Sequence, residues 1–282
     1  MNILTFDLEE WFHLLDHQST KTEMEWNAFS ERIRKNTDRI LELLGRHQQK
    51  ATFFCLGWIA RKYPDVIRKI TAEGHEIACH SDMHQPVYEQ TPAHFREDLR
   101  SAIGSIEDAC GKKVITYRAP GFSITTEVLW AFDILAESGI LIDSSIFPAR
   151  RTHGGFPFID KAQPSIIHKN GIEIKEFPIN TFRIAGKPII FSGGGYFRLI
   201  PYFFIRRISE KSEYILTYFH PRDMDPGQPT IKDLPVYRKF KSSVGLNSAE
   251  KKLSHWLSEF PFINMETAVN RITWDQVPII HL

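Results

Sequence analysis

The residues best suited to chemistry are two histidines in the stretch ACHSDMHQPV, residues 78–87. His80 and His84 stand four positions apart. On one helical turn this spacing puts both imidazoles on the same face, within reach of one cation. Spacing alone does not separate a metal site from two solvated loop histidines, because both are consistent with the pattern.

Other reactive side chains follow the ends of apolar, strand-like runs. They are Asp7, Glu9 and Glu10 after residues 3–6, Arg118 at the end of 114–118, Asp143 at the end of 140–143, and His220 after 214–219. Parallel strands would bring all of these to one rim together with the two histidines. Two neutral imidazoles and one carboxylate with open positions describe a catalytic metal site rather than a closed structural one.

Helical and strand-like patterns alternate along the chain and must position these residues. Apolar spacing predicts helices over 27–47, 58–73, 92–110, 126–138, 201–210 and 248–259. It predicts strands over 3–6, 51–57, 75–79, 114–118, 140–143, 172–179, 182–191 and 214–219. Residues 145–170 read as irregular and 221–235 as a loop rich in Pro and Gly. This order predicts an α/β protein with a parallel sheet or barrel and helices outside it.

Composition narrows the class of protein further. The chain has 282 residues, 42% of them hydrophobic, and neither an internal repeat nor a linker, which favours one domain over 1–282. The net charge is +1 and no long basic block occurs, so neither nucleic acid nor an anionic membrane surface is expected as a partner. No stretch approaches the about 18 apolar residues of a membrane span.

The first residues and the cysteines bear on location. Acidic residues begin at position 7, so a secretory signal is not expected. The three cysteines are odd in number and lie in apolar or helical contexts. This pattern is typical of reduced thiols, and we expect a cytoplasmic protein.

The motifs together resemble those of the NodB-type polysaccharide deacetylases, carbohydrate esterase family 4. In this chain they are TFDLEE, HSDMH, RAPGF, DSS and YFHP, in the order of the family's five motifs and spanning residues 3–221. The resemblance implies a distorted (β/α)7 barrel, with a C-terminal extension from about residue 222. DLEEWF, YRAPGFSI, DSSIFP and GGGYFRL further resemble a subgroup associated with bacterial exopolysaccharide or surface-glycan biosynthesis.

The same resemblance implies roles for individual residues. His80, His84 and one carboxylate would hold a divalent metal, most commonly Zn²⁺. Asp7 would be the general base and Arg118 would orient it. The remaining implied roles are His220 as general acid, Asp143 as its orienting partner, and the backbone N–H of Gly121 as an oxyanion donor.

Two departures from the family pattern affect these assignments. The family usually has adjacent aspartates, whereas Leu8, Glu9 and Glu10 follow Asp7. Because alternate strand residues share a face, Glu9 is the expected metal ligand, with Glu10 as the alternative if the strand ends earlier. At Gly121 many relatives carry an aromatic residue, and Phe122 is the candidate to replace that ring.

Further substrate contacts are predicted from aromatic and glycine-rich segments. In FSGGGYFRL, Tyr196 and Arg198 follow three glycines that would let the backbone approach a sugar, although a flexible connection fits equally well. Trp11 after the acid cluster is either a sugar platform or a buried packing residue.

We therefore expect a metal-dependent hydrolase that removes the N-acetyl group from an amino sugar of a bacterial polysaccharide or its precursor. One alternative is hydrolysis of another C–N amide, such as a formamide or a cyclic ureide. The other is a relative that binds glycan without turnover. The sequence does not indicate an oligomeric state.

Overall fold

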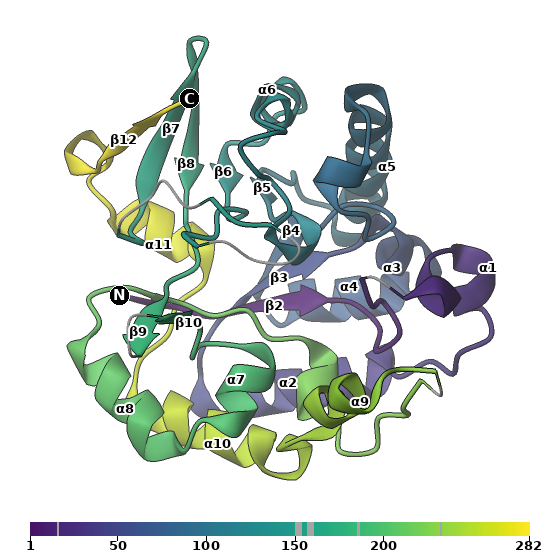
Figure 1. Cartoon of the computed structure of the whole chain (residues 1–282). Coiled ribbons are helices and arrows are strands. Elements are labelled where there is room, and N and C mark those ends of the chain that lie inside the picture. The colour runs from purple at the N-terminus through teal and green to yellow at the C-terminus, as the bar shows by residue number, and fades with distance from the viewer. Residues whose placement is uncertain (16, 150–153, 157–160, 185–186, 232) are drawn as a thin grey trace.

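Short parallel strands form the centre of the molecule and deliver the chain to one common rim (Figure 1). The structure is a computed structural model and describes residues 1–282 except 16, 150–153, 157–160, 185–186 and 232. Its parallel strands are β1 (Asn2–Ile3), β2 (Thr5–Leu8), β3 (Thr52–Cys55), β4 (Glu76–Cys79), β5 (Thr116–Tyr117), β6 (Ile142–Asp143), β8 (Ile172–Glu176) and β11 (Ile215–Leu216). From β2 to β8 they pair in chain order, and β11 pairs with β1 at the other edge.

The two edges of this sheet approach each other through side chains. The Leu216 N–H donates to Oδ1 of Asn180, and the Tyr214 hydroxyl donates to the Pro178 carbonyl, at 2.9 Å each. Within the described residues, β8 and β11 form no strand pairing. With β1 and β2 counted as one interrupted strand, seven parallel strands curve into the distorted barrel that the sequence predicts.

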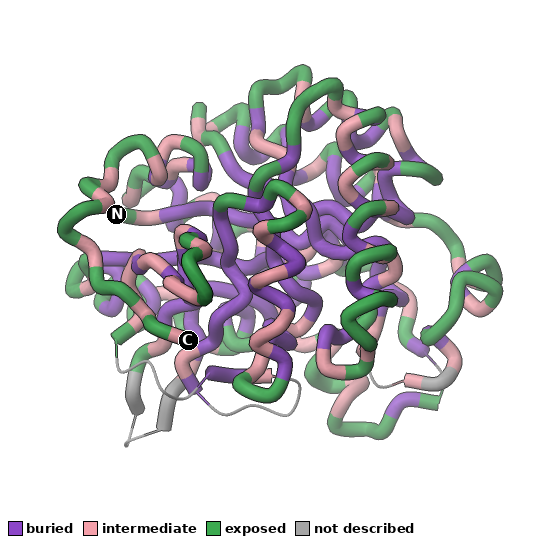
Figure 2. The backbone as a smooth tube through the Cα atoms, turned by 90° about the horizontal axis from the view of Figure 1, so that it is seen from above, coloured by how far each residue is buried: buried purple, intermediate pink, exposed green. Residues whose placement is uncertain are grey.

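Helices surround the strands and their apolar faces pack inward. They are α1 (Glu23–Trp26), α2 (Ile33–His47), α3 (Gly57–Lys62), α4 (Pro64–Ala72), α5 (Pro92–Cys110), α6 (Trp130–Glu137), α7 (Gly194–Leu199), α8 (Tyr202–Lys211), α9 (Val236–Ser243), α10 (Leu246–Glu259) and α11 (Met265–Arg271). Figure 2 shows the buried backbone concentrated in the centre and the exposed backbone around it. No helix among the described residues has the length and apolar character needed to cross a membrane.

Two predicted helices differ from the observed ones for local reasons. The helix expected from residue 27 begins at Ile33, because the Glu10 carboxylate accepts the backbone N–H groups of Arg32 and Ile33. The helix expected over 58–73 is divided between Tyr63 and Pro64, since proline cannot continue the backbone hydrogen bonds.

A hairpin occupies part of the segment expected to be irregular. β7 (Ser165–Lys169) pairs antiparallel with β8, and β12 (Ile279–His281) adds to its other side. Asn170 and Gly171 join β7 and β8 with positive φ angles of 50° and 81°. An Asn-Gly pair is the strongest short-range hairpin signal, so the prediction of irregular structure over 145–170 was wrong at this point.

The C-terminal segment also carries more structure than expected. α9 begins directly after the predicted loop over 221–235, where no helix was expected, and α10 begins at Leu246 rather than at a cap on Ser248. The Leu4 N–H donates to the Ile263 carbonyl, and Trp256 is fully buried. A short antiparallel pair, β9 (Phe182–Ile184) and β10 (Lys187–Ile189), precedes α7.

Candidate active site

Asp7 and Glu9 line one cavity of about 510 Å³ at the rim of the strands. They are two positions apart, and Leu8 between them is buried in the hydrophobic core. This is the alternation that a strand imposes on successive side chains. Other side chains of the cavity wall come from His80, His84, Phe122, Tyr196, Arg198 and His220.

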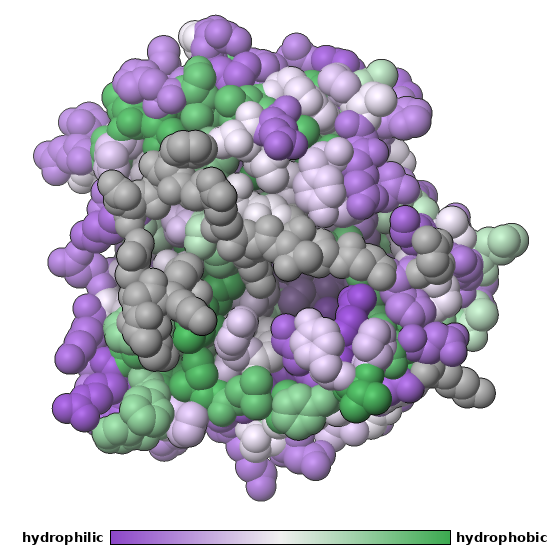
Figure 3. Space-filling model, viewed as in Figure 1, coloured by the Kyte–Doolittle hydropathy of each residue, from purple (hydrophilic) through white to green (hydrophobic). Residues whose placement is uncertain are grey.

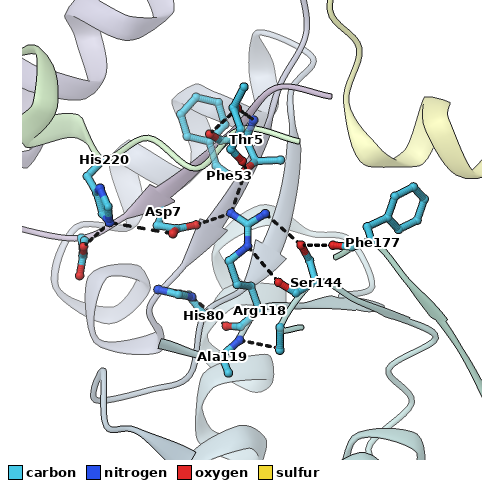
Figure 4. A network of polar contacts seen from close by, with 12 residues as sticks. Thr5, Asp7, Phe53, His80, Arg118, Ala119, Ser144, Phe177 and His220 are labelled. Atoms are coloured by element: carbon cyan, nitrogen blue, oxygen red, sulfur yellow. Dashed lines mark hydrogen bonds and ion pairs between the residues drawn. The ribbon is translucent and has the colours of Figure 1, made fainter. Parts of the chain in front are cut away.

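Arg118 fixes the position of Asp7 from below the cavity (Figure 4). Its guanidinium is fully buried and donates to Oδ1 of Asp7 at 2.7 Å and to the Thr5 hydroxyl at 2.8 Å. Another guanidinium nitrogen donates to the Ser144 hydroxyl at 3.0 Å. Because several partners hold the planar guanidinium of Arg118 in place, its hydrogen bond leaves the Asp7 carboxylate little rotational freedom.

His80 and His84 are placed by a loop, so the shared face that a helical turn would give this spacing is not what brings them together. Ser81 and His84 have positive φ angles of 72° and 55°. The Asp98 carboxylate on α5 accepts the backbone N–H groups of Asp82 and Met83. Asp98, which the motif does not contain, therefore holds the loop that presents both imidazoles.

Hydrogen bonding and burial determine the protonation state of His80. Its Nδ1 lies 2.8 Å from the Arg118 carbonyl, which can only accept, so Nδ1 carries the proton and Nε2 keeps its lone pair. Burial is the main cause that lowers the pKa of His80 to about 4; the charge of Asp7 opposes this shift and the neighbouring His84 adds to it. The ring centres of His80 and His84 are 5.5 Å apart.

Glu9 lies between the imidazoles of His84 and His220. Its Oε2 is 2.8 Å from Nε2 of His84, and its Oε1 is 3.0 Å from Nε2 of His220. Burial favours the neutral acid, but the charges of His84 and His220 outweigh it and hold the pKa of Glu9 below its ordinary value. Oε2 is buried, and its close contact with His84 contributes to the lowered pKa of Glu9.

These donors fit a divalent metal in chemical type. A buried carboxylate oxygen in contact with His84, together with the imidazole of His80, whose Nε2 keeps its lone pair, matches the types of donor that zinc takes in catalytic sites. Within the described ranges, no three His, Cys, Asp or Glu side chains are already gathered around one point.

Glu10 and Trp11 lie away from this cavity. The Glu10 carboxylate accepts three backbone N–H groups, two of them at the start of α2, and is engaged as a helix cap. Trp11 is 6% exposed, packs edge-on against Phe29 and donates its indole N–H to the Ser30 carbonyl. The packing alternative for Trp11 therefore matches the structure, and a sugar platform does not.

Asp223, which the sequence analysis missed, is the partner of His220. Its Oδ2 lies 3.0 Å from His220 Nδ1 and accepts the His220 backbone N–H at 2.9 Å. Burial lowers the pKa of His220, but the charge of Glu9 and the hydrogen bond to Asp223 outweigh it and raise that pKa. The available signal was an acid three residues after the histidine, at the start of the short 3-10 helix η4 (Pro221–Met224).

Asp143 does not orient His220, and that prediction was wrong. Its two oxygens accept the hydroxyl and the backbone N–H of Ser145. Burial and the adjacent Asp143 raise the pKa of Glu176 well above its ordinary value, which favours the protonated form of Glu176. Asp143 and Glu176 end β6 and β8, and Ser144, which follows Asp143, accepts a hydrogen bond from Arg118.

The remaining predicted contacts divide into cavity-lining and structural residues. Gly121, with a positive φ of 61°, and Phe122 both line the cavity, and Tyr196 is 41% exposed at its mouth. Arg198 also faces the cavity, but its guanidinium donates to the carbonyls of Lys241 and Ser242 on α9. Substrate contact is therefore secondary to the support that Arg198 gives α9.

His13 is a cavity residue without an expected role. It is 1% exposed, and its Nδ1 accepts the backbone N–H of Glu10 at 3.2 Å. The proton therefore resides on Nε2, which is buried and has no hydrogen-bond partner among the described residues. Burial and the neighbouring His84 lower the pKa of His13 well below its ordinary value, so it is a neutral donor.

Comparison with known proteins agrees with this geometry. Residues 17–136 match the family model described as polysaccharide deacetylase, which includes His80, His84 and Arg118. Over this range, 120 of its 282 residues, the chain is similar to the polysaccharide deacetylases. Residues 144–270 match a second model, described as a domain of unknown function, DUF3473. His220 and Asp223 lie in this second match, so the cavity contains residues from both matched segments.

Individual relatives extend the comparison. The chitooligosaccharide deacetylase of Bradyrhizobium sp. (strain ANU 289) is 31% identical over 102 residues, 36% of this chain and 44% of the relative. The chain thus matches less than half of that relative's length.

Solved structures show the same fold. A protein from Mycobacterium smegmatis assigned to the polysaccharide deacetylases matches with a TM-score of 0.66 at 18% identity, over 99% of this chain and 92% of that chain. A family 4 carbohydrate esterase pseudoenzyme from Bacillus anthracis matches with a TM-score of 0.51 at 14% identity, over 100% and 69%. At these identities the similarity concerns the fold alone.

Proposed function

We propose that this chain is a metal-dependent N-deacetylase of an N-acetylated amino sugar in a bacterial glycan or its precursor. The observation that carries the proposal is the arrangement around Glu9. His84 and His220 flank its carboxylate, and Asp7 from the same face of the strand is held by buried Arg118. The match of residues 17–136 to the polysaccharide deacetylase model and the similarity to a chitooligosaccharide deacetylase support the choice of reaction.

Three residues would hold the metal. Glu9, His80 and His84 offer a carboxylate oxygen and two imidazole nitrogens, a set that suits Zn²⁺. The metal, when bound, supplies a Lewis acid for the acyl carbonyl and makes a water molecule more acidic. Glu10 is engaged at the start of α2, which favours Glu9 as the carboxylate ligand.

Asp7 and His220 would move protons on the two sides of the scissile bond. Asp7, oriented by Arg118, takes the proton of the attacking water as general base. His220 gives a proton to the leaving amine from Nε2, because Asp223 holds Nδ1. The raised pKa of His220 keeps more of it protonated near neutral pH, as a general acid requires.

Oxyanion stabilisation would come from the main chain at the cavity wall. Gly121 lines the cavity beside Phe122, and its N–H is the candidate donor to the developing negative charge. Phe122 offers an apolar surface next to the acyl group. The cytoplasmic location and the link to exopolysaccharide biosynthesis stay predictions.

The test combines metal analysis with product identification. Purified protein should bind about one divalent ion and release acetate from N-acetylglucosamine oligosaccharides, and a chelator should abolish release. Formate release from N-formylated sugars, or ring opening of a cyclic ureide, would instead support the other C–N amide reaction. Metal binding with glycan affinity and no released acid would identify a non-catalytic relative.

A further inference from the structure

Exposed apolar side chains gather on the helices beside the mouth of the cavity. Among the described residues, thirteen large hydrophobic side chains are exposed, and seven of them lie on α7, α8 and α9. We call these seven the mouth patch: Tyr196, Leu199, Phe203, Phe204, Val236, Tyr237 and Phe240. Figure 3 shows apolar side chains along the lower edge of the hollow, over these helices. Clustering of this kind marks an interaction surface.

The mouth patch is continuous with the cavity. Tyr196, Leu199 and Tyr237 line the cavity itself. The buried Arg198 ties α7 to α9 through the carbonyls of Lys241 and Ser242. α8 follows α7 after two residues and presents Phe203 and Phe204 to solvent. A partner on these helices therefore meets the entrance of the cavity.

Positive charge accompanies the mouth patch. α8 and α9 together carry six Lys and Arg side chains and one carboxylate, whereas the whole chain has a net charge of only +1. The Arg207 guanidinium lies 5.6 Å from the ring centre of Phe203, and the Lys241 ammonium lies 5.4 Å from that of Tyr237. Cations placed among exposed rings match an anionic lipid interface, where rings enter the acyl boundary and cations meet headgroups.

The side-chain types favour lipid over glycan as the occupant. Five of the seven members of the mouth patch are Leu, Val or Phe and have no polar side-chain atom. A sugar pressed against such side chains would leave hydroxyl groups without hydrogen-bond partners, which costs free energy. Acyl chains carry no such groups.

We propose that the mouth patch docks this protein onto an anionic membrane surface, with the cavity opening at that surface. The sequence contains no basic block long enough to predict this, because the charges come from α8 and α9, which are separated by residues 212–235. The fold assembles the surface from the two segments. Docking requires neither a bound metal nor turnover, so it is testable apart from the proposed function.

Vesicle sedimentation of the full chain tests the apolar part of the proposal. The protein should bind vesicles of phosphatidylcholine with phosphatidylglycerol, and bind weakly to phosphatidylcholine alone. Phe203→Ser with Phe204→Ser should lower the partition coefficient by at least about tenfold, because two rings no longer enter the bilayer. Ile115→Ser with Leu141→Ser, at the starts of β5 and β6, makes the same exchange at exposed positions elsewhere and should leave binding unchanged.

Charge reversal tests the electrostatic part. Arg207→Glu with Lys211→Glu should weaken binding to the anionic vesicles, and high salt should weaken binding of the unaltered protein. Lys35→Glu with Lys112→Glu changes the net charge equally at exposed positions away from the mouth patch and should have a much smaller effect.

Several results would overturn the proposal. One is equal binding to neutral and anionic vesicles, and another is the absence of vesicle binding. A third is a Phe203→Ser, Phe204→Ser protein that binds vesicles normally but no longer forms a dimer that the unaltered protein forms. Retention on an immobilised acidic polysaccharide without vesicle binding would identify a glycan surface instead.

Acetate release from a soluble oligosaccharide should be unchanged in the Phe203→Ser, Phe204→Ser protein, because neither residue lines the cavity. Failure of docking and failure of the proposed activity are thus observed separately.

Discussion

At the scale of single residues, similar acids acquire different tasks from their surroundings. Glu9 and Glu10 are neighbours and both are buried, yet one faces two imidazoles and the other caps a helix. Asp143 and Asp223 differ in the same way, because one binds Ser145 beside the buried Glu176 and the other holds His220. Burial without a compensating charge raises the pKa of an acid, and a nearby cation lowers it.

Asp7 and His80 have separable roles under the proposed mechanism. Asp7→Asn should retain the metal and lose about 10²–10⁴-fold in turnover, because only the general base is removed. His80→Ala should lose metal and activity together. Metal content by elemental analysis and acetate release distinguish the two. Loss of metal in Asp7→Asn would mean that base and ligand are interchanged.

Asp223→Asn should move the pH dependence of turnover. His220 acts as an acid, so activity falls as pH rises through its pKa, and Asp223 contributes to raising that pKa. Removing the charge lowers the pKa of His220, and the alkaline limb of the pH profile should shift to lower pH. Asp108→Asn, an exposed charge loss on α5, should leave the profile unchanged. An unshifted limb in Asp223→Asn would exclude His220 as the acid.

At the scale of elements, close helix packing supports the histidine loop. α3 packs closely against α5 at Gly57, where an added Cβ would lie 2.7 Å from the Cα of Ala102 and 2.0 Å from Oδ1 of Asp82. Asp82 lies between the two histidines of the motif and pairs with Arg61. A small residue at the start of α3 therefore serves the site although it touches neither histidine.

Gly57→Ala should destabilise the protein by about 1–3 kcal/mol through overpacking and weaken metal binding as Asp82 is displaced. Gly104→Ala is the matched control, since a Cβ there meets nothing within 4 Å on an exposed helix position. It should stabilise the protein by about 0.5–1 kcal/mol, because Ala restricts the unfolded chain. Urea unfolding and metal titration provide both measurements. Equal effects of the two substitutions would contradict the packing argument.

At the scale of the whole molecule, the second half of the chain completes the first. β11 pairs with β1, and the Ile263 N–H and carbonyl bond to Asn2 and Leu4 on the same edge. Lys252 on α10 donates to three carbonyls at the end of α7, so the helix that borders the cavity depends on a later one. These long-range contacts lead us to expect one cooperative unit.

Unfolding of the full chain should therefore be a single transition. Tryptophan fluorescence and far-UV circular dichroism should give the same urea midpoint. A chain ending at residue 222 should fail to fold, since it lacks the fully buried Trp256 and the hydrogen bonds of Ile263. Two separated transitions, or a folded shortened chain, would show that residues after 222 form an independent domain.

The sequence by itself determined the alternation of elements and the arrival of Asp7, His80, Arg118 and His220 at one rim. These follow from local periodicity and from the rule that parallel strands share a direction. Two local signals were nevertheless missed. The apolar periodicity over 58–73 hid the helix break at Pro64, and the turn at residues 170–171 lay at the end of a segment expected to be irregular.

Only the tertiary structure decided which neighbours each reactive group has. Glu9 faces the cavity while Glu10 meets the start of α2, and Asp223 rather than Asp143 reaches His220. The positive charges beside the cavity mouth likewise come from two helices that are separated in the sequence, α8 and α9. Such pairings depend on contacts between residues far apart in the chain, and a pattern read along the sequence carries no information about them.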